Sequence, residues 1–563
     1  MSSESEKEPD GRHRVVVIGG GMAGARLAQQ LAAVSEAADA TAAGGAAPAG
    51  GTTAAAAPVV TVTVIGEEPH APYNRVLLAE VLAGRYAPEV VALPAPAAHH
   101  LRGVRAVRID RGPRTVHCDD GRRVPYDTLV LATGSNPVLP PLRGLFEADS
   151  HELPEGVHAF RTMDDCLTLA AAVREPGVRV VVIGGGLLGV SAARALAQRG
   201  AQVVLAHQGE HLMERQVDAH AAGVLRAHLE ALGVEVHTEC RVRGLRTEAA
   251  RGADASSTPT SRRPAGGADR GPRAPRGRRA PVPRAVRAVV LADGFTLDTD
   301  LVVFACGVRP RVGLARAAGL DVARGVVVDD ELRTSDPSIH AIGDCAEHDG
   351  VVYGLAGPAQ EQADVLARAI AARLRDPDQP RDHDRVRDAD QPRDADHRHH
   401  AGDQDGHQAT HQPGHHGSGG DAPHRYRGTR ALTRLTLAAP PAAAARPATD
   451  DPATGSPAAA HPTTAVPQAD APAAAPAATA AVCGPLDLAT FGEAVPAPGD
   501  DVVQLSDATR GAYRKVVVRQ DRLVGGILLG DLGTVGALAR AWEGDAPLPA
   551  APLLHLLTND GGS

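Results

Sequence analysis

Aromatic residues make up only 2% of this 563-residue sequence, and its six cysteines never form a C-x-x-C pair. Scattered cysteines of this kind fit neither a disulfide framework nor a zinc or iron–sulfur site, so we expect no metal and a reducing, cytoplasmic setting. No stretch is apolar for long enough to span a bilayer, and the polar N-terminus has no secretory core. The modest net charge of -9 argues against a nucleic-acid partner. The sequence therefore predicts a cytoplasmic protein without membrane or nucleic-acid contacts.

Blocks of low complexity divide the chain. Of three predicted insertions, the first is rich in Ala, Gly, Thr and Pro, the second in Arg, Pro and Gly, and the third in Ala, Pro and Thr, and a fourth block is a linker rich in Asp, Arg and His. Such compositions cannot bury enough apolar surface to fold, so we predict that all four are disordered. They cover 37–58, 249–286, 439–480 and the linker 375–427.

The first chemical motif lies in HRVVVIGGGMAGARLAQQLAAV (13–34), which is typical of a strand, a glycine turn and a helix. Its glycines are Gly19, Gly21 and Gly24, the G-x-G-x-x-G spacing that brings backbone N–H groups to a pyrophosphate. Glu67 follows the next strand, 46 residues after Gly21, or 24 once the 22 residues of 37–58 are removed. An acidic residue about 20 positions on is expected to hold a ribose. The motif therefore predicts a dinucleotide site.

A second G-x-G-x-x-G, formed by Gly184, Gly186 and Gly189, follows a strand that begins at 178. The acidic residue is missing here, because the next strand ends in Leu-Ala-His-Gln (205–208). A carboxylate would favour NADH and an arginine NADPH. The preference between them stays open.

Three further segments carry a family resemblance: LVLATGS (129–135), FACGVRPRVGLA (304–315) and HAIGDCAE (340–347). They resemble segments of the two-dinucleotide-domain flavoproteins, which include glutathione reductase, ferredoxin and rubredoxin reductases and NADH oxidases. The resemblance implies FAD at the first glycine motif and NADH or NADPH, as substrate, at the second. It assigns Thr133, Gly134, Gly343 and Asp344 to FAD, with Asp344 on the ribitol, and Gly307 to the nicotinamide cofactor.

PYNRVLLAEVLAG (72–84), the segment 184–218 and YRKVVVRQDRLVGGILLGD (513–531) narrow the resemblance. They are similar to the flavoprotein region of assimilatory nitrite reductase large subunits and to the electron-transfer subunit of assimilatory nitrate reductase. This implies that Arg75 contacts the flavin phosphates or adenosine. No segment resembles the cysteine-rich [2Fe-2S] module or the sirohaem domain of nitrite reductases. We therefore expect no nitrite reduction by this polypeptide alone.

Two departures from the family pattern concern chemistry. Ser191 occupies the position where relatives usually carry a glutamate near the nicotinamide, so a role that needs a carboxylate is in doubt. No cysteine lies in 71–84, the segment that carries a redox-active thiol in many of these flavoproteins. FAD is then expected to be the only redox centre, no catalytic residue is assigned, and electrons leave to a separate acceptor protein. The implied acceptor is a ferredoxin-like protein or a nitrite or nitrate reductase subunit.

The predicted fold class is α/β, with two Rossmann-like domains as in glutathione reductase and a small α+β C-terminal domain. A ferredoxin or rubredoxin reductase, or an NADH oxidase, is an alternative function, and a non-catalytic flavin- or nucleotide-binding regulator is another. The oligomeric state is open and a homodimer is compatible with the sequence. The predicted domains are an FAD-binding domain in two parts (11–160 and 300–374), an NAD(P)-binding domain (161–299), the linker 375–427 and a C-terminal domain (428–555).

Overall fold

A computed structural model describes most of the chain outside the low-complexity blocks. Most residues of the four blocks predicted to be disordered lie outside the described part of the chain. The chain divides into two compact units, the first comprising Met1–Asn74, Ala92–Asn136 and Pro310–Thr429 and the second Arg75–Val91, Pro137–Arg309 and Arg430–Ser563. The described residues are 12–43, 60–94, 98–147, 152–249, 283–375, 425–430, 432–438, 484–507, 509–544, 547–548, 555 and 557.

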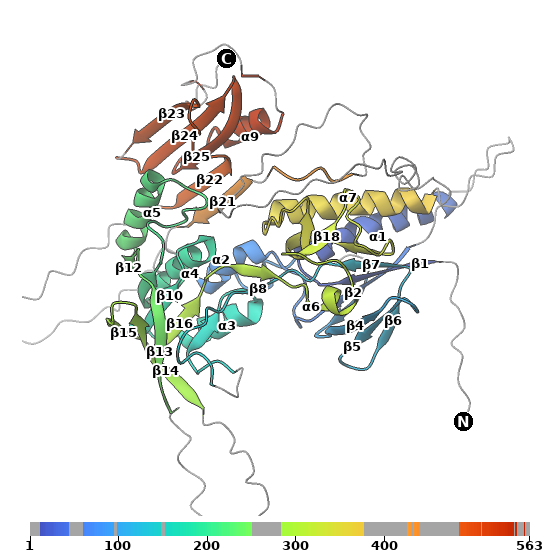
Figure 1. Cartoon of the computed structure of the whole chain (residues 1–563), viewed down its shortest axis with the longest axis horizontal. Helices are drawn as coiled ribbons and strands as arrows, with labels where there is room; N and C mark the ends of the chain where they lie inside the picture. The colour runs from blue at the N-terminus through green and yellow to red at the C-terminus, as the bar shows by residue number, and fades with distance from the viewer. Residues whose placement is uncertain are drawn as a thin grey trace, which may run out of the picture. The chain divides into compact units, whose positions relative to one another are not determined.

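A five-stranded parallel sheet forms the centre of the first unit. Its strands read as short apolar runs because a parallel sheet is buried on both faces. Helices α1 (Met22–Ala43) and α7 (Ala356–Arg375) lie side by side against it, as Figure 1 shows. The strand order is β19 (Ile339–Ala341), β7 (Thr128–Leu131), β1 (His13–Ile18), β2 (Val60–Gly66) and β3 (His99–Arg102).

Four elements extend into the segments that were expected to be insertions or linker; β13 (Val242–Ala249) and α7 (Ala356–Arg375) do so by a single residue, α1 and β14 by more. Helix α1 continues to Ala43, seven residues into the predicted block 37–58, because its Ala-rich sequence retains helix propensity. Strand β14 begins at Arg284, inside the predicted block 249–286, since its pairing with β13 starts there. Composition alone therefore placed these block boundaries inside helices and strands.

Small sheets and short helices complete the first unit. Strands β4 (Ala106–Asp110), β5 (Thr115–Cys118) and β6 (Arg123–Pro125) form an antiparallel sheet, and β18 (Val326–Val328) pairs in parallel with β20 (Ala346–His348). The short helices α6 (Gly313–Ala317) and η2 (Gly343–Cys345) also belong to this unit. Strands β8 (Ser135–Pro137) and β17 (Val308–Pro310) each contain residues of both units.

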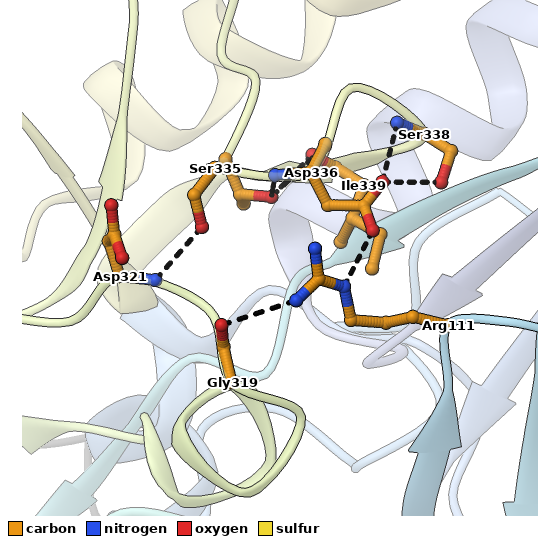
Figure 2. A network of polar contacts seen from close by, with 8 residues as sticks. Arg111, Gly319, Asp321, Ser335, Asp336, Ser338 and Ile339 are labelled. Atoms are coloured by element: carbon orange, nitrogen blue, oxygen red, sulfur yellow. Dashed lines mark hydrogen bonds and ion pairs between the residues drawn. The ribbon is translucent and has the colours of Figure 1, made fainter.

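A polar network fixes the approach to β19. Arg111, just after β4, donates from Nε to Asp336 Oδ2 at 2.6 Å and from Nη1 to the Gly319 carbonyl at 3.3 Å (Figure 2). Asp336 Oδ1 also accepts from the backbone N–H of Ser338 at 3.0 Å. The turn before β19 is thereby held in one geometry, and β19 leads directly to the predicted flavin residues Gly343 and Asp344.

The second unit repeats the parallel architecture. Helix α4 (Leu187–Gln198) follows the central strand β10, and α2 (Leu78–Leu82), η1 (Arg75–Leu77), α3 (Met163–Ala172) and α5 (Ala219–Ala231) belong to the same unit. As predicted, β13 (Val242–Ala249) and β14 (Arg284–Leu291) pair as an antiparallel hairpin, with β15 (Thr296–Asp298) beside β14. The parallel strand order is β12 (Val234–His237), β11 (Gln202–Ala206), β10 (Arg179–Ile183), β16 (Leu301–Phe304) and β9 (Val157–Ala159).

An antiparallel sheet and helix α9 (Val535–Glu543) form the C-terminal part of the second unit, drawn in red in Figure 1. Leu538 and Trp542 of α9 pack on Phe491, so one face of this sheet is closed. The predicted α/β class with two Rossmann-like sheets and an α+β C-terminal part is confirmed. No helix in the described part of the chain is both long and apolar enough to cross a membrane. The strand order is β21 (Leu432–Leu437), β22 (Leu486–Gly492), β25 (Arg522–Leu529), β24 (Ala512–Arg519) and β23 (Asp501–Asp507).

Candidate functional site

The first glycine motif turns the chain from β1 into α1. Gly19 has φ +120°, and a Cβ there would lie 2.0 Å from the Ala132 carbonyl oxygen. A Cβ on Gly24 would lie 2.1 Å from the Gly19 carbonyl oxygen, whereas one on Gly21 would meet nothing within 4 Å. The outer glycines are thus required by packing, and the middle one leaves open space at the helix N-terminus. Open space beside first-turn N–H groups fits a pyrophosphate.

Gly343, far from the glycine motif in the sequence, lies beside the first turn of the same helix, and Asp344 follows it directly. The Gly343 N–H donates to Gln362 Oε1 of α7 at 2.7 Å, and a Cβ on Gly343 would lie 3.1 Å from the Cβ of Ala23 in the first turn of α1. Asp344 Oδ2 accepts a hydrogen bond from Ser135 Oγ at 2.9 Å. The structure therefore brings residues far apart in the sequence to one edge of the sheet.

Arg311 joins further members of the predicted flavin set. Its Nη1 donates to Glu67 Oε2 at 2.8 Å, and its backbone N–H donates to the Gly134 carbonyl at 2.9 Å. Thr133 Oγ1 donates to the Arg311 carbonyl at 2.9 Å. Sequence reasoning missed Arg311, although it lies within the quoted segment 304–315, because nothing there distinguishes it from Arg309. Sequence reasoning also missed Ser135 and Gln362, because no spacing or pattern in the sequence marks either residue.

Arg75, the remaining residue predicted to contact FAD, lies in η1 of the second unit. Its Nη1 donates to the Arg161 carbonyl at 3.0 Å. Its contact with the flavin stays a prediction. The other predicted flavin residues all belong to the first unit: Gly19, Gly21, Gly24, Glu67, Thr133, Gly134, Gly343 and Asp344.

The second glycine motif repeats the geometry of the first. Gly184 has φ +113°, and a Cβ there would lie 2.4 Å from the Ala305 carbonyl oxygen. A Cβ on Gly189 would lie 1.7 Å from the Gly184 carbonyl oxygen. Gly186 is the N-cap of α4 and offers no side chain to the first-turn N–H groups. Those groups are free of a side-chain cap at the place where a nucleotide phosphate would accept from them, so this site fits a second dinucleotide.

The end of the following strand differs between the two sites. Ile18 pairs with Ile65 in the first sheet and Ile183 pairs with Ala206 in the second, so Gln208 is the counterpart of Glu67. His207, one residue earlier, accepts a hydrogen bond from the Gly185 N–H at its Nδ1 (3.1 Å). Burial lowers the pKa of His207 and favours the neutral ring that can accept in this way. An imidazole and an amide therefore stand where the first site has a carboxylate.

Gly307 and Ser191 were both assigned to the nicotinamide side. Gly307 follows β16 with φ +95°, and its carbonyl accepts from the Val138 N–H at 2.9 Å. Ser191 is 8% exposed on α4 and donates its hydroxyl proton to the Leu187 carbonyl at 2.8 Å. That proton is used within the helix, so Ser191 does not reproduce the usual glutamate. The nicotinamide role of both residues stays a prediction.

The five cysteines within the described ranges are all free thiols, and Cys483 lies outside those ranges. Cys345 is fully buried, and its single S–H proton is shared between the carbonyls of Leu131 and Ile342, each 3.3 Å from Sγ. Burial raises the pKa of Cys166 to about 12 and that of Cys306 to about 11. It also raises the pKa of Cys118, Cys240 and Cys345. A neutral thiol is a poor nucleophile, so none of these five is poised for thiol redox chemistry.

Helix α2, on the segment that carries a redox-active thiol in many of these flavoproteins, carries a buried ion pair instead. Glu80 pairs with Arg194 of α4 and, at 3.1 Å, with Arg85. Arg194 is completely buried, so the pair fixes α2 against α4. The sequence 71–84 showed Glu80 but gave no sign of its partner, which lies more than a hundred residues away.

Two parallel sheets, each with a glycine turn at a helix N-terminus, define a protein that binds two dinucleotides. Residues 13–263 and 271–363 match the pyridine nucleotide-disulphide oxidoreductase family, and 482–543 match the rubredoxin NAD+ reductase C-terminal domain. The first match covers more than half of the sequence, so the chain belongs to the pyridine nucleotide-disulphide oxidoreductase family. It is accordingly an FAD-dependent oxidoreductase that uses NAD(P)H, as predicted.

Curated relatives also bear out the predicted resemblance. The chain is 34% identical over 364 residues to nitrite reductase [NAD(P)H] of Bacillus subtilis, covering 64% of this chain and 37% of the relative. It is 32% identical over 365 residues to the assimilatory nitrate reductase electron transfer subunit of the same organism, covering 64% and 39%. The chain therefore spans less than two-fifths of the length of these relatives.

Solved structures share the fold. The covalent putidaredoxin reductase–putidaredoxin complex superposes with a TM-score of 0.60 at 18% identity, covering 97% of this chain and 99% of the other. NADH:rubredoxin oxidoreductase of Clostridium acetobutylicum gives a TM-score of 0.52 at 16% identity, covering 97% and 99%. At such identities the likeness concerns the fold alone.

Proposed function

We propose that this protein passes electrons from NADH or NADPH through FAD to a separate acceptor protein, in nitrite or nitrate assimilation. The observation that carries the proposal is the state of the thiols: all five described cysteines are free, three of them (Cys118, Cys166 and Cys345) are buried, and α2 contains no cysteine. With no thiol relay among the described residues, electrons that reach the flavin must leave by another route. A protein acceptor is the route that the similarity to the nitrate reductase electron transfer subunit supports.

The residues that would hold the cofactors follow from the two glycine turns. The N-terminus of α1 with Gly21, together with Glu67 and Asp344, would bind FAD, and that of α4 with Gly186 would bind the nicotinamide cofactor. Bound FAD supplies hydride acceptance from the nicotinamide and stepwise electron release, chemistry that needs no protein nucleophile. The chain's own part is to position the cofactors and to orient polar groups: Ser135 donates to Asp344, and Arg311 donates to Glu67.

A rubredoxin or ferredoxin reductase is the second candidate. The match of 482–543 to the rubredoxin NAD+ reductase C-terminal domain favours it. Both candidates predict the same first half-reaction and differ only in the acceptor. Acceptor assays with rubredoxin, ferredoxin and the nitrite and nitrate reductase subunits therefore separate them.

An anaerobic titration of the FAD-loaded protein with NADH, and separately with NADPH, tests the proposal. We expect two electrons per chain and plain bleaching of the flavin band, because in this proposal FAD alone takes up electrons. Uptake of four electrons, or a long-wavelength thiolate–flavin band, would assign a redox role to a cysteine and overturn the proposal. Failure of both nucleotides to reduce the flavin would favour a non-catalytic nucleotide-binding protein.

A further inference from the structure

The loop between β11 and α5 lies directly on the second glycine motif. The Met213 N–H donates to the Gly185 carbonyl at 2.9 Å, and Leu212 Cδ2 would lie 2.7 Å from a Cβ placed on Gly185. Both side chains are 1% exposed. Met213 has φ +53°, a left-handed conformation that a residue with a side chain keeps only where surrounding contacts hold it. We call residues 207–218 the cofactor loop.

The same loop is held from its other side by the C-terminal sheet. Asp218, the last loop residue, accepts at Oδ2 from Tyr513 Oη at 2.7 Å and from Lys515 Nζ at 2.9 Å. Thr490 of β22 donates from Oγ1 to the Gln216 carbonyl at 2.7 Å. The loop is therefore fixed between the glycine motif and β22 and β24 of the sheet.

These contacts are built into the interior rather than laid on the surface. Tyr513 is fully buried and Lys515 is 7% exposed, so both polar groups depend on Asp218 for partners. Asp218 is also the N-cap of α5, since its Oδ1 accepts from the Ala221 N–H at 3.0 Å. Burial alone would raise the pKa of Asp218, but the hydrogen bonds from Ala221, Lys515 and Tyr513 outweigh it and lower the pKa. The carboxylate is thus ionised and committed to three donors.

We propose that Asp218 is a positioning residue through which the C-terminal sheet governs nicotinamide-cofactor binding. The sheet holds Asp218, Asp218 fixes the end of the cofactor loop, and the loop in turn holds Gly185 of the glycine motif. Affinity for the nicotinamide cofactor then depends on a sheet that supplies no residue to the glycine motif. This inference rests on the assignment of the Gly184–Gly189 turn to NAD(P)H.

Two neighbouring contacts make a clean test possible. Ser506 of β23 lies 3.0 Å from the exposed His220 Nε2, on the same side of the sheet but outside the cofactor loop. The carbonyl of Ala438, after β21, accepts from Gln198 Nε2 of α4 at 2.7 Å. This second anchorage keeps the sheet attached to α4 when Asp218 is changed. Ser506→Ala is the matched control.

The experiment measures NAD+ and NADP+ binding to the oxidised, FAD-loaded full chain by titration calorimetry. We expect Asp218→Asn and Lys515→Met to weaken the preferred nucleotide by at least about fivefold, the lower end of usual site-to-site coupling. With ferricyanide as artificial acceptor, KM for the reduced nucleotide should rise by the same factor while kcat is unchanged. Ser506→Ala should leave both unchanged. Tyr513→Phe, which removes one hydrogen bond and no charge, serves if Asp218→Asn does not fold.

Coupling is reciprocal, so the nucleotide must also act on the sheet. Saturating nucleotide should slow hydrogen exchange of β24 in the wild type and not in Lys515→Met. Unchanged nucleotide affinity with a lowered Tm would show that Asp218 is only structural, and would overturn the inference. Failure of the wild type to bind either nucleotide would instead refute the cofactor assignment itself.

Discussion

The two glycine turns of this protein have nearly the same backbone and different surroundings. Gly19 and Gly184 have φ of +120° and +113°, and a Cβ on either would strike the carbonyl of the neighbouring strand. The outer glycines Gly24 and Gly189 each pack on the first glycine of their own turn. This close backbone approach belongs to the strand–turn–helix unit itself, so it identifies a dinucleotide site without saying which dinucleotide binds.

We expect the residues around the two glycine turns to determine which dinucleotide binds at each. In the first turn, a Cβ on Gly20 would meet only Gly66 Cα at 3.9 Å, whereas in the second turn the Gly185 N–H is engaged by His207 and its carbonyl by Met213. Glu67 comes directly after the second strand of the first site, and Gln208, two residues after β11, is its counterpart in the second site. We therefore expect selectivity to come from the strand end and the loop that follows it, rather than from the glycines.

The largest test of this comparison breaks one turn at a time. Gly24→Val should abolish FAD binding, because its side chain would enter the Gly19 carbonyl, and the protein should purify colourless. Gly189→Val should keep the yellow flavin but lose reduction by NADH and NADPH at least about 100-fold, close to 3 kcal/mol. Visible absorption before and after nucleotide addition measures both.

Gly223→Ala is the control for these two variants. Gly223 is exposed on α5, and a Cβ there meets nothing within 4 Å. Alanine in a helix interior is favoured over glycine by about 0.5–1 kcal/mol. The control should bind FAD and nucleotide normally with a slightly raised Tm. Equal behaviour of Gly24→Val and Gly223→Ala would contradict the packing argument.

A second, smaller test changes the strand end of the first site. Glu67→Gln removes the carboxylate expected to hold the FAD ribose and weakens the pair with Arg311. A hydrogen bond to a charged group contributes about 1.5–3 kcal/mol, so FAD affinity should fall about 10- to 100-fold. Fluorescence of released FAD on dilution measures it.

The reciprocal variant is Gln208→Glu, which gives the second site the residue of the first. It should disfavour NADPH by repelling its 2′-phosphate while leaving FAD affinity unchanged. A fall in FAD affinity would mean that the two sites are not independent. An unchanged NADH to NADPH preference would mean that Gln208 does not face the ribose.

The parts of the site that the sequence predicted are those set by local spacing. Gly19, Gly21, Gly24 and Glu67 follow from the pattern once the Ala-rich block is recognised, because turn, helix and strand end are close along the chain. The structure differs only at the edges of such blocks, where α1 runs on to Ala43. Alanine supports both a helix and a low-complexity linker, so composition does not locate that boundary.

Long-range partners are the parts that spacing does not reveal. Arg311 reaches Glu67 across 244 residues, Arg194 reaches Glu80 across 114, and Lys515 reaches Asp218 across 297. Each arginine or lysine looks like an ordinary surface charge in the sequence. Only the strand order and the sheet edges determine which carboxylate it meets. The sequence alone therefore shows which residues are charged but not which of them form ion pairs.

Each of the two parallel sheets carries a histidine at an equivalent position of an edge strand. His340 pairs with Val130 in the first sheet, and His158 pairs with Val303 in the second. Val130 and Val303 in turn pair with Val17 and Val182, which stand two residues before Gly19 and Gly184. His340 is fully enclosed and His158 is only partly buried. Burial lowers the pKa of both, that of His340 to about 4.

This difference in burial predicts the smallest effect, on stability against pH. Because the folded-state pKa of His340 lies below its unfolded value of 6.5, the unfolded chain takes up the proton first as the pH falls. The contribution of neutral His340 is complete above pH 6.5 and is lost as the pH falls toward about 4. Each pH unit in that window costs about 1.4 kcal/mol. Between about pH 7 and pH 5 the wild type should lose about 2 kcal/mol more than His340→Gln. Urea midpoints of flavin release measure the difference, and His158→Gln should change it less. An equal pH slope for wild type and His340→Gln would show that His340 is not neutral in the folded protein.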